Sequence, residues 1–292
     1  MSTSRIVIAS GKGGSGKTTV ATALVMTLMR DLAEVQLVDC DVEGPDAALF
    51  LKPEIEKSIQ LTVDFPNIDP SKCSGCGTCQ TACQFKAIWV ASGKAEHCGD
   101  LCHACGGCSI VCPEGAVTEK RRRIGVIESG RRENVVFHRG VLDVGRHMAT
   151  PIVNGLKAVA RGDIATIVDS APGTGSHVTA TITDCDYCIL VTEPSPFGLY
   201  DLKIAVRTVE KLGVPMGIVI NKDEVWSSNI EAYASEIGIP ILMRIPFRRE
   251  IASLCARGIP ITEVASSWDE AFWDMYARAE RAIWESRSRL PL

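Results

Sequence analysis

The sequence has 292 residues, of which 46% are hydrophobic and 23% charged, and its formal net charge at pH 7 is −4. This length and apolar content suit one large α/β domain or two smaller ones, and the mildly acidic balance predicts no specific nucleic-acid partner. The N-terminal residues contain too short an apolar core for a signal peptide, and no apolar run approaches the length of a membrane span. We therefore expect a cytoplasmic protein without stable membrane binding.

Short apolar segments alternate with helical ones along most of the chain. Strands are predicted at Arg5–Ser10, Glu34–Asp41, from Ile164, from Tyr187, at Val214–Lys222 and at Ile239–Phe247. Helices are predicted at Lys17–Arg30, Leu199–Leu212, Ile230–Ile237 and Trp268–Arg287. This alternation predicts an α/β fold with a mostly parallel, doubly wound sheet of the P-loop NTPase type. Ligands of such sheets bind beyond the carboxyl ends of the strands.

The alternation breaks between Leu61 and Glu119, where the chain is rich in Cys and Gly and only short elements are expected. We interpret this stretch as a small α+β domain inserted into the larger one. The predicted organisation is a first part of the α/β domain at residues 1–60, an insert at 61–119, and the remainder of the α/β domain at 120–292.

The stretch GKGGSGKTT follows the first predicted strand and spans Gly11–Thr19. It matches the phosphate-binding pattern GxxxxGK[ST], in which backbone N–H groups and a helix N-terminus hold phosphate oxygens. Lys17 is expected to reach the β- and γ-phosphates, and the Thr18 hydroxyl is expected to bind Mg²⁺. The residues expected to hold ATP or ADP here are Gly11, Gly13, Gly14, Ser15, Gly16, Lys17, Thr18 and Thr19.

A second lysine, Lys12, lies inside this loop. With it, the sequence resembles the deviant P-loop ATPases of the MinD/ParA class, which includes the nitrogenase iron protein. In that class this lysine crosses a homodimer interface to the ATP of the partner. The resemblance therefore implies an ATP-dependent homodimer and a Mg²⁺-dependent ATPase that is slow without its partner.

Three further segments resemble parts of that class. Asp39 and Asp41 end the second predicted strand, as in the first switch, where Asp41 would orient the attacking water. The segment VDSAPGTG resembles the second switch, and its Asp169 would join Thr18 and Asp39 around Mg²⁺. The segment VINK resembles the adenine contact. The residues expected at the adenine are Asn221, Pro246 and Phe247, although Arg248 stands where an acid is often found.

The chain has thirteen cysteines, and nine of them lie between Cys73 and Cys112. In a reducing compartment, clustered cysteines indicate metal or redox chemistry. The spacing Cx2Cx2Cx3C occurs twice, and it is the run of bacterial ferredoxins, whose fourth Cys ligates the other cluster. The first [4Fe–4S] cluster is expected on Cys73, Cys76, Cys79 and Cys112. The second is expected on Cys102, Cys105, Cys108 and Cys83.

Zinc is the alternative metal, but its four-cysteine sites usually pair two separated CxxC units. Gln84 replaces the proline that usually follows the fourth cysteine, without removing a ligand. Cys98 is not expected to be a ligand. The pair Cys185 and Cys188 is expected to pack in the core, although a metal site that bridges a dimer stays an alternative.

The whole chain resembles MinD-superfamily ATPases that contain an inserted ferredoxin domain with two clusters. The resemblance implies an ATP-driven dimer switch coupled to electron transfer toward a redox partner that the sequence does not identify. An ATPase that assembles or delivers a metal or iron–sulfur cofactor to a partner protein is the second hypothesis. A spatial regulator like MinD or ParA is the third.

Overall fold

The computed structural model describes residues 3–223, 228–263 and 265–288. The chain divides into two compact units. The first comprises the chain up to Ser58, Ile127–Val141, and the chain from Val153 onward. The second comprises Ile59–Val126 and Leu142–Ile152.

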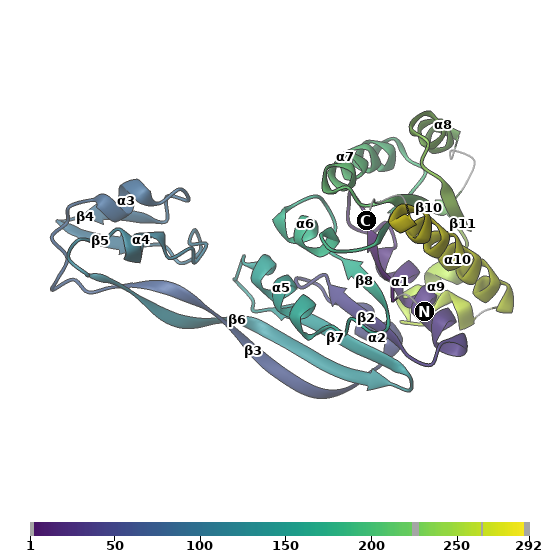
Figure 1. The fold of residues 1–292 in the computed structure, drawn as a ribbon, viewed down its shortest axis with the longest axis horizontal. Coiled ribbons are helices and arrows are strands. Elements are labelled where there is room, and N and C mark those ends of the chain that lie inside the picture. Colours follow the sequence, from purple (N-terminus) through teal and green to yellow (C-terminus); the bar gives the residue numbers. More distant parts are fainter. Residues whose placement is uncertain (1–2, 224–227, 264, 289–292) are drawn as a thin grey trace. The chain divides into compact units, whose positions relative to one another are not determined.

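The first unit is built on a nine-stranded sheet with the order β11-β10-β9-β1-β8-β2-β7-β6-β3 (Figure 1). The pairings among the seven strands from β11 to β7 are parallel. Their bounds are Arg5–Ala9 (β1), Val35–Cys40 (β2), Val135–Leu142 (β7), Ala165–Ser170 (β8), Tyr187–Thr192 (β9), Met216–Asp223 (β10) and Ile241–Pro246 (β11). The predicted α/β fold with a mostly parallel sheet is therefore confirmed, and each predicted strand corresponds to an observed one.

Helices connect these strands. Their bounds are Lys17–Asp31 (α1), Ala47–Leu51 (α2), Ala149–Val159 (α5), Ser176–Ile182 (α6), Pro196–Leu212 (α7), Ser228–Ile237 (α8), Arg249–Ala256 (α9) and Ser266–Ser288 (α10), with a 3-10 turn at Ile261–Glu263. The core packs the buried side chains of α1, such as Leu24 and Leu28, with Phe272, Met275 and Ala279 of α10 and the apolar strands. Burial of this apolar surface is the main stabilising term of the sheet domain.

Two long strands, β3 (Glu54–Ile68) and β6 (Val117–Arg132), are neighbours and continue from the first unit into the second (Figure 1). The expectation of only short elements from Leu61 was therefore wrong at its beginning. The strand follows from a two-residue period, since Ile59, Leu61 and Val63 are half-buried between exposed polar neighbours. β6 turns into β7 through only two residues, so these two strands run antiparallel.

The rest of the second unit consists of short elements. They are helix α3 (Thr78–Ala82), the antiparallel strands β4 (Ile88–Ala91) and β5 (Lys94–His97), and helix α4 (Gly107–Ile110) (Figure 1). One buried cluster in this unit comprises Cys79, Ile88 and Ala95, with Cys73, Cys83 and Cys108 packed against it. Cysteines thus make up much of that small core.

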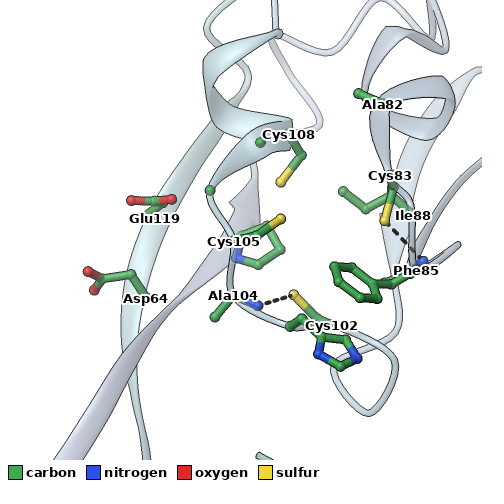
Figure 2. A pocket seen from close by; sticks show the side chains of 15 residues that line it. Asp64, Ala82, Cys83, Phe85, Ile88, Cys102, Ala104, Cys105, Cys108 and Glu119 are labelled. Atoms are coloured by element: carbon green, nitrogen blue, oxygen red, sulfur yellow. Dashed lines mark hydrogen bonds between the residues drawn. The ribbon is translucent and has the colours of Figure 1, made fainter. Parts of the chain in front are cut away.

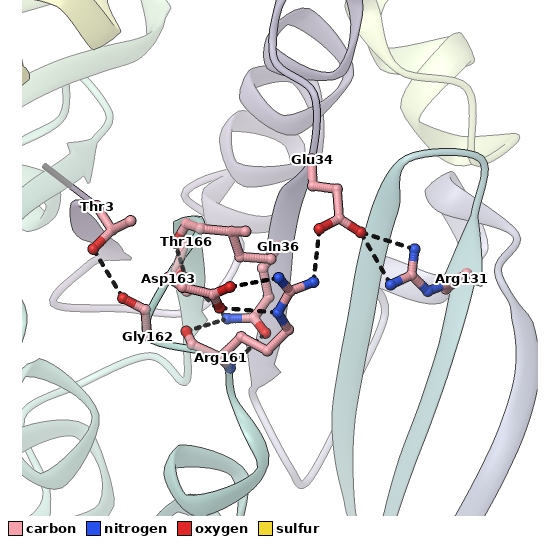
Figure 3. A network of polar contacts seen from close by, with 9 residues as sticks. Thr3, Glu34, Gln36, Arg131, Arg161, Gly162, Asp163 and Thr166 are labelled. Carbon is pink, nitrogen blue, oxygen red and sulfur yellow. Dashed lines mark hydrogen bonds and ion pairs between the residues drawn. The ribbon is translucent and has the colours of Figure 1, made fainter. Parts of the chain in front are cut away.

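A buried amide ties β2 to β8 and to the loop before it (Figure 3). The Gln36 side chain is fully buried, donates to the Thr166 hydroxyl at 2.9 Å and accepts from the Arg161 backbone N–H at 2.9 Å. The Arg161 guanidinium extends the contacts to Glu34 and Asp163, both at 2.7 Å. Because a buried polar group is stable only when it is hydrogen-bonded, Gln36 fixes the chain beside β8.

We expect Gln36→Leu to lower the free energy of unfolding by about 1–3 kcal/mol, because it leaves buried polar partners unsatisfied. Urea unfolding followed by circular dichroism measures this change. Thr3→Ala is the control, because it removes an exposed hydrogen bond to Gly162. Equal midpoints for the two variants would contradict the role of Gln36.

Candidate functional site

The loop between β1 and α1 has the backbone that a phosphate-binding loop requires. Gly14 and Gly16 have φ angles of 73° and 98°, which strongly favour glycine. A Cβ atom on Gly16 would lie 2.1 Å from the Asn221 side-chain nitrogen, so no larger residue fits without displacing Asn221. The loop therefore depends on a close contact with the end of β10.

Asn221 holds this loop through its own amide. Its Nδ2 donates to the Ser15 carbonyl at 2.8 Å, and its Oδ1 accepts from the Lys222 N–H at 2.9 Å. The side chain of Lys222 donates to the Gly14 carbonyl at 2.8 Å. The end of β10 thus fixes the shape of the loop, and the adenine contact of Asn221 stays a prediction.

A cavity of about 440 Å³ opens beside the loop, within the usual size range of small-molecule sites. It brings together Gly13, Gly14, Gly16, Lys17, Thr18, Thr19, Asp41, Asn221, Pro246 and Phe247 from the predicted set. The residues that line it but were not among the predicted site residues are Gly44, Asp46, Pro172, Lys222, Arg248, Ile251, Ala252 and Cys255. Gly11, Lys12 and Ser15 line a separate small cavity against α7 instead.

Asp39 and Asp169 lie in register on adjacent strands β2 and β8, and both side chains are fully buried. Asp39 accepts from the N–H groups of Asp41 and Ala47, each at 3.1 Å. Burial, reinforced by Asp169, raises the pKa of Asp39 well above its usual value. Two buried carboxylates on adjacent strands are stable only with protons, hydrogen bonds or a compensating positive charge.

Asp169 has less such compensation than Asp39 within the described residues. Neither of its buried carboxylate oxygens has a hydrogen-bond partner there. Burial raises the pKa of Asp169 to about 7, although the Thr18 hydroxyl and the Lys17 charge act in the opposite direction. Carboxylate oxygens beside a hydroxyl are ligands that suit Mg²⁺, so Asp169, Asp39 and Thr18 fit the ion expected at this place.

Asp41 follows β2, is half-buried and lines the large cavity. Burial raises the pKa of its carboxyl group, and the charge of Lys17 opposes this rise. The Lys17 side chain is itself buried. The structure thus brings Asp41 and Lys17 to the same cavity from different elements.

Lys12 points to a carboxylate of its own chain. It forms an ion pair with Glu193, which also pairs with Lys222 at 3.2 Å. Burial alone would raise the pKa of Glu193, but hydrogen bonds from the two lysines lower it. The structure contains one chain, so contact of Lys12 with a partner's nucleotide stays a prediction.

In the second unit, the eight cysteines of the two runs fall into two separate cavities. Cys73, Cys76, Cys79 and Cys112 line one cavity, which we call the first cradle. Cys83, Cys102, Cys105 and Cys108 line the other, which we call the second cradle. Figure 2 shows the four sulfur atoms of the second cradle directed into a common space. Each cradle thus combines three cysteines of one run with the fourth cysteine of the other.

In each run, a backbone N–H group donates to the sulfur atom of the fourth cysteine. The Ala87 N–H lies 3.3 Å from Cys83 Sγ, and the Ala116 N–H lies 3.3 Å from Cys112 Sγ. Similar bonds reach Cys73 from Ala95 at 3.3 Å and Cys102 from Ala104 at 3.4 Å. Such bonds stabilise negative charge on sulfur, which suits thiolate ligands.

The eight cysteines of the cradles all lie among the described residues and are free, but no three of them are close enough to hold one metal ion. All eight cysteines are free thiols, which a cluster requires as ligands. Within residues 3–223, 228–263 and 265–288, no group of three or more His, Cys, Asp or Glu side chains is close enough to hold one metal ion.

The other cysteines lie elsewhere. Cys98 lines neither cradle. Cys185 and Cys188 are buried at the start of β9, where burial raises the pKa of Cys185 to about 12 and that of Cys188 well above its usual value. Neutral, buried thiols of this kind are chemically inert, in agreement with a packing role.

The chain belongs to the family described as the CobQ/CobB/MinD/ParA nucleotide binding domain, whose sequence profile matches residues 6–261. It thus has the P-loop ATPase fold of the MinD/ParA class. Its fold is similar to MinD from Pyrococcus horikoshii complexed with Mg-ADP, with a TM-score of 0.59, 20% identity and 96% of each chain covered.

Curated relatives extend the comparison. An uncharacterised protein of Methanocaldococcus jannaschii is 28% identical over 87% of this chain and 89% of its own length. The iron-sulfur cluster carrier protein of the same organism is 25% identical over 92% of this chain and 81% of its own. The carrier protein of Rickettsia felis is 24% identical over 89% of this chain and 66% of its own. Relatives named as iron–sulfur carriers thus align with most of the chain.

In the part of the chain that the structure describes, no helix is both long enough and apolar enough to cross a bilayer.

We expect Gly16→Ala to destabilise the nucleotide-free protein by at least about 1–2 kcal/mol, the cost of a left-handed backbone for a residue with a Cβ. Gly13→Ala is the matched control, because its Cβ would meet no atom within 4 Å. Thermal unfolding without nucleotide compares the two variants. Similar unfolding temperatures would show that the contact with Asn221 does not constrain the loop.

Proposed function

We propose that this protein binds and hydrolyses ATP and couples a nucleotide-dependent dimer switch to electron transfer through two [4Fe–4S] clusters. The observation that carries the proposal is the crossed division of eight cysteines between two cradles. The same chain holds a phosphate-binding loop beside a nucleotide-sized cavity. The two sites together favour an ATP-driven redox protein over a simple nucleotide switch.

In the first unit, the loop from Gly11 to Thr19 holds the phosphates through its backbone N–H groups and the start of α1. The buried Lys17 ammonium neutralises charge on the β- and γ-phosphates. Bound Mg²⁺ supplies charge neutralisation at the phosphate oxygens. Thr18, Asp39 and Asp169 hold and orient the ion.

Hydrolysis requires a positioned water molecule. Asp41 lines the cavity and orients this water toward the γ-phosphate. Lys12 leaves Glu193 and reaches the nucleotide of a second copy of the chain, so that the active form is a dimer. Asn221, Pro246 and Phe247 contact the base.

The insert, residues 61–119, is a ferredoxin-like domain. The first cradle holds one cluster through Cys73, Cys76, Cys79 and Cys112, and the second holds another through Cys83, Cys102, Cys105 and Cys108. Each cluster supplies a one-electron couple, whose potential depends on hydrogen bonds to sulfur and on solvent access. The four backbone N–H groups that reach cradle sulfur atoms support the negative charge of these ligands.

A short stretch of backbone connects the nucleotide site to the insert. Asp39 accepts from the N–H of Ala47, the first residue of α2. α2 ends at Leu51, and β3 begins at Glu54. The Asp41–Asp46 segment is thus joined to β3 through the short helix α2, so a change in this segment on ATP binding would act on β3 through that helix.

The relatives favour a second candidate function. Several are named iron-sulfur cluster carrier proteins and align with most of this chain. By this alternative, the ATPase assembles or delivers a cluster to an acceptor protein. Intact transfer of a cluster to an apoprotein would favour it over electron transfer.

Anaerobically purified protein is expected to contain two four-iron clusters. Cys83→Ser should remove one ligand of the second cradle and lower the iron and acid-labile sulfide content toward half. Cys98→Ser should leave both unchanged, because Cys98 lines neither cradle. Full iron content in Cys83→Ser, or zinc in place of iron, would contradict the ligand assignment.

We expect the cluster potentials to depend on nucleotide. Anaerobic redox titration followed by EPR compares the protein without nucleotide, with MgADP, and with a non-hydrolysable MgATP analogue. A shift of about 60 mV or more between states corresponds to tenfold coupling for a one-electron couple. Lys17→Ala is the control and should show no shift. Identical potentials in the three states would favour the carrier alternative.

A further inference from the structure

The two cysteine runs form an internal repeat, so their surfaces can be compared position by position. Cys73 begins the first run and Cys102 the second, and residues at the same distance from these two cysteines are equivalent. The backbone supports this equivalence, because three equivalent pairs have positive φ angles. They are Gly75 and Ala104, Gly77 and Gly106, and Lys86 and Gly115. Differences between the two surfaces must therefore come from side chains.

Exposed side chains at three equivalent positions differ in character. The residue before the first cysteine, the residue after it, and the residue two positions after the fourth cysteine are exposed in both runs. At the first cradle these residues are polar, and they are Lys72, Ser74 and Glu114. At the second cradle they are apolar or aromatic, and they are Leu101, His103 and Phe85, which we call the second rim.

The cysteines of the second cradle are also the less buried set. Each cradle has one exposed cysteine, Cys76 in the first and Cys105 in the second. The first cradle contains the buried Cys79, whereas the remaining cysteines of the second are all half-buried. Because the rate of electron transfer falls steeply with distance, a cluster with less buried ligands is better placed to exchange electrons at the surface.

The second rim presents a rigid apolar surface beside these sulfur atoms. Leu101 is 52% exposed and Phe85 is 42% exposed. The Phe85 and His103 rings are stacked, with centroids 3.8 Å apart and an angle of 19° between the planes. Figure 2 shows the Phe85 ring beside the sulfur atoms of the second cradle. Exposed apolar side chains that lie together indicate a protein contact, and aromatic residues are enriched in such contacts.

Acidic side chains lie beside the second rim. Asp64 and Glu119 line the second cradle, and Asp100 directly precedes Leu101. All three acids are exposed. Arg121 offsets one of their charges through its pair with Asp64 at 3.8 Å. The thiolate ligands of a cluster add further negative charge here, so this surface complements a basic partner and repels an acidic one.

We propose that the second rim and the acids beside it form the docking surface for a redox protein whose own centre has an apolar edge bordered by Lys and Arg. The cluster of the second cradle is then the one that exchanges electrons directly with this partner. The inference rests on the proposed function, since it requires the two clusters.

Oxidised cytochrome c is the probe, because its haem has an apolar edge bordered by lysines. The full-length protein is reduced anaerobically with dithionite, and the excess is removed before mixing. One electron passes from the reduced [4Fe–4S]⁺ cluster, which becomes [4Fe–4S]²⁺, to the haem Fe³⁺, which becomes Fe²⁺, and no bond or proton is exchanged. Stopped-flow absorbance of the reduced haem gives the second-order rate constant at several salt concentrations.

Leu101→Ser changes the rim outside the cavity and should lower this rate constant about fivefold or more, the usual cost of truncating a central contact residue. Phe85→Ser combined with it should lower the rate constant further. Trp89→Ser is the matched control and should leave it unchanged, because Trp89 is 39% exposed but lines neither cradle.

The charge of the surface is tested separately. The rate constant of the unmodified protein should fall as salt is added, because salt screens the attraction. Glu119→Gln should lower it about twofold at low salt and weaken its dependence on salt. Glu114→Gln removes the same charge beside the first cradle and should have the smaller effect.

Equal rate constants for Leu101→Ser and Trp89→Ser would overturn the inference. A larger effect of Glu114→Gln than of Glu119→Gln, or a rate that rises with salt, would also overturn it. Iron and sulfide analysis and the EPR signal of each reduced variant, taken before mixing, separate this failure from that of the proposed function. Protein without clusters contradicts the proposed function, whereas two reducible clusters with a rate indifferent to the second rim contradict only the docking surface.

Discussion

Two buried carboxylates, Asp39 and Asp169, stand side by side on adjacent parallel strands, and this arrangement determines much of the first unit. Like charges without solvent repel strongly, so the fold is stable around them only with protons, hydrogen bonds or a cation. Asp39 is partly satisfied by backbone N–H groups, including that of Ala47. The negative charge of Asp169 is compensated by the Thr18 hydroxyl and the Lys17 charge, and a bound ion would add to this. A cation bound at the nucleotide site would therefore stabilise the carboxylates at the ends of β2 and β8.

The sheet and the phosphate-binding loop could be predicted because their signals are local. A short apolar segment such as Ile6–Ala9 predicts a buried strand. The positive φ angles of Gly14 and Gly16 strongly favour glycine, so the glycines in the sequence mark the loop. The cysteine spacing likewise predicts two groups of four cysteines. Each group takes the first three cysteines of one run and needs a fourth from the other run. The structure places the fourth, Cys83 or Cys112, in the cavity of the other run.

Features that depend on distant contacts could not be predicted. Lys12 pairs with Glu193, 181 residues away, and no local pattern indicates this contact. The cavity wall on α9, with Ile251 and Cys255, belongs to a short helix without a motif. β3 did have a signal, the two-residue alternation from Ile59 to Phe65, but the neighbouring cysteine-rich stretch obscured it. The stack of Phe85 on His103 joins two loops from different runs.

The position of the small unit between β3 and β6 has an evolutionary consequence. Because these strands are hydrogen-bonded neighbours, the chain leaves the sheet and returns to it at adjacent points. A hairpin tip of this kind can gain or lose an entire domain without changing the register of the strands that flank it. An ATPase with a plain hairpin at this place could thus acquire a cysteine-rich domain in one recombination event, with its nucleotide site unaltered.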